Sequence, residues 1–264
     1  MGHVRLGSWP KSKKWNEVVN FIASGMAANK VAAAVLKAAE LAFNRIGYDV
    51  GYEHASWLLF QLSEAAAHKS PLDYLRTQGV DIKEASIAGI ATALTNAMDE
   101  SNRSKKHLST ESEIARNALV GAVTSTVAAA MHQPTFFEGE NNYAEEAVKK
   151  LGSPKAFASM FQKYLTNFMD RGLKFYLDKQ LSAHLGEDKR FRTLEEQQQF
   201  RKEIEQHCRE CSVVLPKYAE DWVAKHRYHE EGGINQKNFK GFSVFGLQKL
   251  VSMLRLEKEE FDAR

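Results

Sequence analysis

The sequence predicts an all-α fold, a multi-helix bundle with an Ala-rich N-terminal half and an aromatic-rich C-terminal half that contains long helices. From Trp15 onward, apolar residues recur at the 3.6-residue spacing of an amphipathic helix, and the alternation typical of a strand is nearly absent. The 264 residues include only 16 Gly and 5 Pro, so few positions disfavour a helix. Several segments also begin with residues that cap helices.

Helical periodicity divides the chain into segments separated by turn residues. The predicted helices cover residues 14–24, 27–46, 49–67, 84–101, 110–131, 142–151, 154–185, 193–229 and 236–261. Pro216 should kink or divide the segment 193–229, because proline lacks an N–H and clashes with the carbonyl four residues back. The last segment carries an apolar stripe wide enough to be buried against two neighbours: Phe239, Phe242, Phe245, Leu247, Leu250 and Leu254.

Five positions carry a more specific helix-start signal. Three of them pair a capping residue with a Glu three positions later, the spacing of a capping box: Asp81 with Glu84, Thr110 with Glu113, and Thr193 with Glu196. Two place proline at the first helical position, where the missing N–H costs nothing: Ser70-Pro71 and Ser153-Pro154. We therefore expect helices to begin at these five places.

Composition changes near residue 132. Residues 1–131 contain 24 Ala and 9 aromatic residues, whereas residues 132–264 contain 8 Ala and 18 aromatic residues. Small side chains let helix backbones approach closely, and rings fill a wider core, so the two halves should pack differently. We predict a basic arm at residues 1–14, a helical subdomain at 15–131 and a second at 142–264, or one continuous domain built from both.

Charge and cysteine content exclude several classes of protein. The 36 Lys and Arg residues exceed the 33 Asp and Glu residues by only 3, so charge alone indicates neither nucleic-acid nor membrane binding. Two cysteines cannot form a disulfide framework. We see no signal peptide and no apolar run of 18 residues, and we therefore expect a cytoplasmic protein with no membrane partner.

The predicted arm is basic and bracketed by two tryptophans. It contains no acidic residue, and its Gly and Pro residues disfavour a helix. One interpretation is a solvated terminus, since termini are often disordered. The other is a contact surface for a protein partner, formed by Arg5, Trp9, Lys11, Lys13, Lys14 and Trp15.

One group of cysteines and histidines has a spacing similar to that of zinc ligands. Cys208, Cys211, His226 and His229 form the pattern C-x2-C-x14-H-x2-H. The Cys pair, however, lies in a helical stretch without a turn residue, and the His pair has one residue too few between its members. We therefore predict two buried or half-buried thiols and no metal, with structural zinc as the alternative.

Motifs of nucleotide and hydrolytic chemistry are absent from the sequence. There is no P-loop, no dinucleotide-binding glycine pattern, no H-E-x-x-H and no G-x-S-x-G. Glu203 and His207 are four residues apart and can share a helical face, but one pair supplies too few ligands for a metal. We expect neither an enzyme nor a bound cofactor, although a site assembled from distant residues is still open.

Basic and aromatic residues interleave in the C-terminal half, and this pattern supports an alternative function. Such residues hold phosphates and stack on bases, so the chain could bind nucleic acid through Lys189, Arg190, Arg192, Lys237 and Lys240. Residues 151–264 nevertheless contain 17 acidic residues beside 20 basic ones. A mixed, solvated surface is the competing interpretation.

Three strings carry a resemblance to a group of proteins. They are Met1-Gly2-His3-Val4-Arg5-Leu6-Gly7-Ser8, Lys14-Trp15-Asn16-Glu17-Val18-Val19 and the stretch from Phe200 to Cys211. They look like uncharacterised helical bacterial proteins encoded as accessory components of antiphage operons. The resemblance implies a bacterial cytosolic protein that works beside other subunits, and no catalytic residue carries over. Our leading hypothesis is a non-enzymatic adaptor or accessory subunit of a multi-protein complex.

Overall fold

The computed structural model describes residues 13–106, 108–131, 143–228 and 233–256, and this part of the chain is all-α. It contains no β-strand, although an isolated bridge pairs Leu185 with Phe191. The helices are α1 (Lys13–Ala23), α2 (Ala28–Ala38), α3 (Glu40–Ile46), α4 (Val50–Ala65), α5 (Pro71–Thr77), α6 (Ile87–Ser104), α7 (Thr110–Ala130), α8 (Tyr143–Lys149), α9 (Pro154–Ala183), α10 (Leu194–Cys211), the 3-10 turn η1 (Ser212–Val214), α11 (Leu215–Tyr228) and α12 (Gln236–Arg255). The predicted all-α bundle is confirmed.

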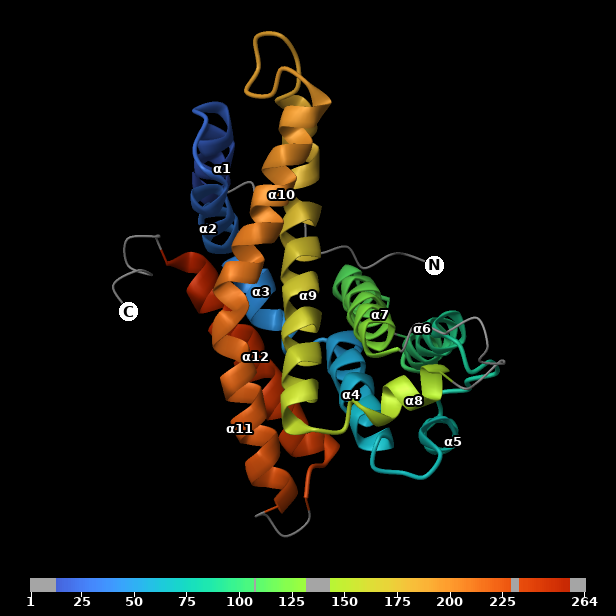
Figure 1. Cartoon of the computed structure of the whole chain (residues 1–264). Coiled ribbons are helices and arrows are strands. Elements are labelled where there is room, and N and C mark those ends of the chain that lie inside the picture. The colour runs from blue at the N-terminus through green and yellow to red at the C-terminus, as the bar shows by residue number, and fades with distance from the viewer. Residues whose placement is uncertain (1–12, 107, 132–142, 229–232, 257–264) are drawn as a thin grey trace.

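Figure 1 shows α9 as the long axis of the molecule. On one side α10 and α11 follow each other along α9, and α12 packs against both of them. On the other side α7 and α4 contact α9, and α5, α6 and α8 lie outside them. The hairpin formed by α1 and α2 packs beside α10 and α12.

Two of the predicted long helices are interrupted in the structure. The segment predicted at 27–46 breaks at Ala39, which ends α2 and precedes α3. The division expected near Pro216 is confirmed, since α10 ends at Cys211 and α11 begins one residue before the proline. Proline is accommodated there because the first turn of a helix has no acceptor for its missing N–H.

Some of the predicted helix starts are confirmed by the structure and others are not. Ser153 and Thr193 are N-caps whose hydroxyls accept from the backbone N–H groups three residues on, as predicted. Ser70 precedes Pro71 at the start of α5 as predicted, without a side-chain cap. The start predicted at Asp81 is wrong, because the hydroxyl of Ser86 caps α6 instead.

The start predicted at Thr110 is shifted by one residue, because Ser109 is the N-cap of α7. The Ser109 hydroxyl accepts from Ser112 N at 2.9 Å and donates to Asp49 Oδ2 at 2.8 Å. Asp49 in turn caps α4 through Tyr52 N. The buried serine therefore joins two helix starts, which a sequence pattern within one helix does not reveal.

One hydrophobic core runs through both halves of the chain. Phe60 of α4 packs 5.8 Å from Phe157 of α9 and 4.9 Å from Phe239 of α12, measured between ring centroids. Phe161 and Phe242 continue this cluster at 4.7 Å. The aromatic core expected for the C-terminal half is thus present, and it extends onto the Ala-rich half.

Candidate functional site

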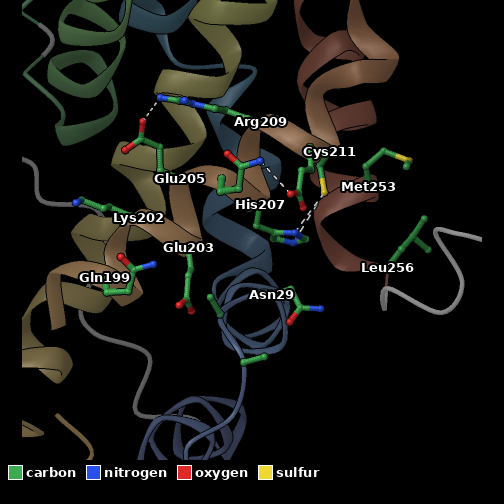
Figure 2. A pocket seen from close by; sticks show the side chains of 14 residues that line it. Asn29, Gln199, Lys202, Glu203, Glu205, His207, Arg209, Cys211, Met253 and Leu256 are labelled. Atoms are coloured by element: carbon green, nitrogen blue, oxygen red, sulfur yellow. Dashed lines mark hydrogen bonds and ion pairs between the residues drawn. The ribbon is translucent and has the colours of Figure 1, made fainter. Parts of the chain in front are cut away.

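A groove of about 950 Å³ lies between α10, the start of α2 and the end of α12. Figure 2 shows polar side chains of α10 along one wall, with Asn29 of α2 opposite and Met253 and Leu256 at the α12 end. Its remaining lining residues are Ala27, Ala28, Gln199, Lys202, Glu203, Glu205, Gln206, His207, Arg209, Glu210 and Cys211.

The sequence of α10 explains why its polar side faces the groove. Phe200, Ile204 and Cys208 recur every four residues and are buried against the body of the protein. The opposite positions are charged and pair along the helix, with Arg209 donating to Glu205 and Gln206 Nε2 donating to Glu210 at 3.0 Å. Such i,i+4 contacts stabilise the helix slightly.

His207 and Cys211 form the one contact in this groove that resembles a catalytic pair. Cys211 Sγ lies 3.7 Å from Nδ1 and 3.9 Å from Nε2 of His207. Nearly equal distances to both nitrogens place the sulfur beside the ring rather than along either N–H direction. The imidazole is instead hydrogen-bonded to the backbone of Leu254, which fastens α10 to α12.

Burial keeps both members of this pair neutral. It lowers the pKa of His207 below its ordinary value of 6.5 and raises the pKa of the Cys211 thiol to about 12. A cysteine nucleophile needs the opposite environment, in which a cation stabilises the thiolate. The geometry and electrostatics of this pair therefore supply packing and a helix-to-helix hydrogen bond, and no activated nucleophile.

The zinc-like set is dispersed in the structure. Cys208 and Cys211 are both buried free thiols, in agreement with the packing role predicted for them. His226 lies on α11, where its ring stacks on Trp222 at 4.0 Å and Nδ1 is 2.7 Å from the Trp222 carbonyl oxygen. His229 lies outside the described residues. Within the described ranges, no three His, Cys, Asp or Glu side chains are grouped to hold a metal ion.

The residues predicted as a partner contact in the arm divide into two groups. Arg5, Trp9 and Lys11 lie outside the described residues. Lys13 and Lys14 are exposed in the first turn of α1, and Lys14 Nζ lies 3.7 Å from Glu40 Oε2. Trp15 is only 6% exposed and packs 6.4 Å from Tyr176, so it anchors α1 in the core and is not a surface contact.

The five basic residues of the predicted nucleic-acid surface do not form one patch. Lys189, Arg190 and Arg192 lie in the connection between α9 and α10, and Lys237 and Lys240 lie in the first turns of α12. Figure 1 places these two regions at opposite ends of the stack formed by α10 and α11. The sequence pattern did not reveal this separation, because two helices, α10 and α11, lie between the two groups of residues in the chain.

Two of these cations are also engaged within the protein. Lys240 Nζ contacts Glu53 Oε2 at 2.6 Å. Arg190 is half-buried and donates to the carbonyl oxygens of Ile22 at 3.1 Å and Met26 at 2.7 Å. Burial lowers the pKa of Arg190 below its ordinary value. Arg190 therefore fastens the turn of the α1–α2 hairpin and is not available to a phosphate.

Comparisons with known proteins give no relative to reason from. No protein-family model, no curated protein and no solved structure matches this chain. In the part of the chain that the structure describes, every helix is too short or too polar to cross a membrane. The function must therefore be argued from the surface of the molecule.

The sequence missed one exposed apolar region. Phe245 was expected to be buried with the other phenylalanines of α12, but it is 51% exposed. Leu41 and Tyr48 are 75% and 74% exposed and lie at or just after α3. Phe239 and Phe242 are three residues apart and share the inner face of α12. Phe245 continues the same three-residue spacing, and because a helix turns every 3.6 residues this step carries it outward.

Proposed function

We propose that this protein is a non-enzymatic adaptor or accessory subunit that docks a protein partner on one exposed apolar face. We call it the α3–α12 face. It consists of Leu41, Tyr48 and the outward-facing positions of α12, which are Gly241, Phe245, Gln248 and Ser252. The exposure of Leu41, Tyr48 and Phe245 is the observation that carries the proposal.

Contacts between α3 and α12 support the continuity of this face. A Cβ atom on Gly47, directly before Tyr48, would lie 2.8 Å from a methyl group of Val244, directly before Phe245. At the other end, Arg255 Nη1 lies 3.2 Å from Glu40 Oε1, directly before Leu41. These two contacts connect the residues at both ends of α3 to α12.

The chemistry of the α3–α12 face favours a protein as the occupant. None of its six residues is charged, although the exposed Arg45 of α3 lies between Leu41 and Tyr48 in the chain and 26% of all residues are Asp, Glu, Lys or Arg. The cores of protein interfaces are depleted in charge and enriched in aromatic residues, whereas nucleic acid selects Lys and Arg. Lys249 packs over the Phe245 ring, with Nζ 5.6 Å from its centroid, and supplies a polar border. We infer a partner subunit with a complementary apolar patch.

The wider setting belongs to the same proposal. The resemblance of residues 1–8, 14–19 and 200–211 to accessory proteins of antiphage operons supports a bacterial cytosolic assembly. The basic arm before α1 is proposed as a second contact with that assembly, through Arg5, Trp9 and Lys11. The neutral His207–Cys211 pair is consistent with a protein that binds and does not catalyse.

The test combines Tyr48→Asp with Phe245→Asp in the native host. The tagged double variant should recover its stoichiometric protein partner at a level reduced at least about tenfold, because charges then enter the core of the interface. Leu194→Asp is the matched control, since Leu194 is 57% exposed at the start of α10 and lies outside the α3–α12 face. Partner abundance is measured by quantitative mass spectrometry.

Three results would contradict the proposal. The partner could be retained by the double variant, or lost equally in the Leu194→Asp control. It could also disappear on nuclease treatment, which would favour the nucleic-acid alternative. Light scattering on the purified protein completes the design, because a dimer that depends on Tyr48 and Phe245 would identify a second copy of this chain as the occupant and overturn the accessory-subunit proposal.

A further inference from the structure

A groove on the outer side of α7 contains two arginines from different helices. This groove, of about 500 Å³, lies between α6, α7 and α9 and is lined by Thr95, Arg116, Asn117, Val120, Gly121 and Arg171. No carboxylate is among the described residues that line it. Figure 1 shows α7 and α12 on opposite sides of α9, so the groove is independent of the α3–α12 face.

The sequence of α7 explains why the groove stays open. The inner face of α7 is buried through residues that include Ala118 and Ala122, whereas Val120 and Gly121 are only half-buried. A Cβ atom on Gly121 would lie 3.4 Å from Asn167 Nδ2 of α9, so the two helices approach each other closely at this point. With small side chains at its base, the groove leaves room for a bound group.

Arg116 is held in place at one side of this groove. Its Nη1 donates to Asp99 Oδ1 of α6 at 2.7 Å, and its side chain is 26% exposed. A guanidinium carries five N–H donors, and this bond is the one that Arg116 makes among the described residues. A side chain already fixed by an ion pair loses less conformational entropy when it binds a ligand.

Arg171 faces the same groove from α9 without a partner of its own. It is exposed and makes no ion pair or hydrogen bond through its side chain in the described part of the chain. The adjacent Asp170 contacts Lys174 Nζ at 2.7 Å instead. Of the two guanidinium groups in the groove, only that of Arg116 is therefore balanced by a carboxylate, and the remaining positive charge favours an anion.

We propose that this groove binds the phosphate group of a small phosphate monoester, with Arg116 and Arg171 donating to its oxygens. The Asn117 side chain, which makes no hydrogen bond among the described residues, supplies a neutral donor in the same groove. A monoester phosphate carries nearly two negative charges and three acceptor oxygens at neutral pH. It can therefore receive two guanidinium groups from different sides, whereas one guanidinium satisfies both oxygens of a carboxylate.

The size and lining of the groove favour a small, polar molecule over nucleic acid. Its volume lies within the range of roughly 300–1,000 Å³ that is usual for small-ligand sites. Val120 is the one residue of its lining with a sizeable apolar side chain, so little of the ligand can be apolar. A nucleic-acid backbone would need a longer row of cations than two arginines supply.

Titration of the isotope-labelled full chain, followed by NMR at constant ionic strength near pH 7.5, tests the proposal. With inorganic phosphate and with methyl phosphate, the amide signals of Asn117 and Gly121 should shift and saturate with a Kd on the order of millimolar. Arg171→Gln should weaken binding at least about tenfold, because charge-assisted hydrogen bonds are lost. Arg192→Gln removes an exposed arginine outside the groove and should leave the Kd unchanged.

Two further probes distinguish the sources of the anion. Dimethyl phosphate, a diester like the nucleic-acid backbone, and acetate should both bind at least about tenfold more weakly than methyl phosphate. Equal affinity for dimethyl phosphate would favour nucleic acid and overturn the proposal, and equal affinity for acetate would remove the preference for phosphate. Shifts that do not saturate, or an unchanged Kd in a folded Arg171→Gln variant, would overturn it as well.

Discussion

Arg190 bonds the turn of the α1–α2 hairpin and Arg255 bonds Glu40 of α3, and the hydrogen bonds of these two guanidinium groups are satisfied to very different degrees. At the turn of the hairpin, Arg190 donates to three carbonyl oxygens, those of Phe21, Ile22 and Met26, and its guanidinium lies 4.5 Å from the centroid of the Phe200 ring. On α12, Arg255 contacts Glu40 through Nη1, whereas its Nε and Nη2 have no hydrogen-bond partner among the described residues.

The comparison separates a guanidinium whose hydrogen bonds are made from one whose hydrogen bonds are incomplete among the described residues. Carbonyls at the end of α1 need donors, and Arg190 supplies several from one rigid fork. Arg227 follows the same principle between α11 and α4, donating to Glu64, Ser63 and the Gly152 carbonyl. Arg255 differs from these two arginines because two of its nitrogens have no hydrogen-bond partner among the described residues, which end one residue later.

The largest expected effect is the loss of the Arg190 contacts. Arg190→Met keeps the length and much of the apolar contact of the side chain but removes all three hydrogen bonds to carbonyls. We expect the free energy of unfolding to fall by about 2–3 kcal/mol, because the hairpin turn loses its charged donors. Urea denaturation followed by circular dichroism measures the change.

Two controls accompany this measurement. Arg192→Met alters an exposed neighbour in the same connection and should change the free energy of unfolding by less than about 0.5 kcal/mol. The same two variants also discriminate the earlier nucleic-acid hypothesis. If Arg190→Met left stability intact but weakened binding to single-stranded DNA, the assignment of Arg190 as a structural contact would be wrong.

The Arg190 case shows what sequence reasoning could and could not provide. Periodicity predicted the helices, and Pro216, Ser153 and Thr193 marked boundaries correctly, because these signals act within a few residues. The carbonyls that Arg190 binds are separated from it by more than 160 residues. A local pattern of Arg and Phe therefore looked like a phosphate-binding surface, although the ring and the cation were partners in a tertiary contact.

The same limit applies to the candidate sites. The spacing of the apolar residues in α12 predicted a broad buried stripe, but it did not show that Phe245 lies at the outer edge of that stripe and is half exposed. Likewise, the spacing of Glu203 and His207 could place them on one face of α10, but it could not show that His207 bonds α12 and stays neutral. Side chains whose role depends on a distant element carry no signal in a single sequence.

The matched substitution at the other arginine should have a much smaller effect. Arg255→Met removes one partly exposed ion pair with Glu40, which contributes little, and also removes two buried N–H groups that have no partner. These two effects oppose each other. We expect a change of less than about 1 kcal/mol in the free energy of unfolding, measured under the same conditions as Arg190→Met. A loss equal to that of Arg190→Met would show that Arg255 is already fully satisfied.

The smallest expected effect is a pH dependence of the free energy of unfolding, which should come from the buried His207 of the groove and not from the two arginines. A guanidinium remains charged across pH 5–8, so the contrast between Arg190 and Arg255 should not change in that range. Burial lowers the pKa of His207 below the ordinary 6.5, against the opposing effects of its hydrogen bond to Leu254 and of Glu210. Below about pH 6.5 the unfolded chain therefore binds more protons than the folded protein, and stability must fall as the pH decreases.

His207→Gln should flatten this dependence between about pH 6.5 and 5, since the amide does not titrate but can still donate to the Leu254 carbonyl. Burial also lowers the pKa of His54, so a remaining slope of the same sign is expected from that residue. Denaturation midpoints at half-unit pH intervals measure both slopes. Identical slopes in the variant and the parent would mean that His207 titrates alike in the folded and unfolded chains, and the buried, neutral imidazole assigned to the groove would then be wrong.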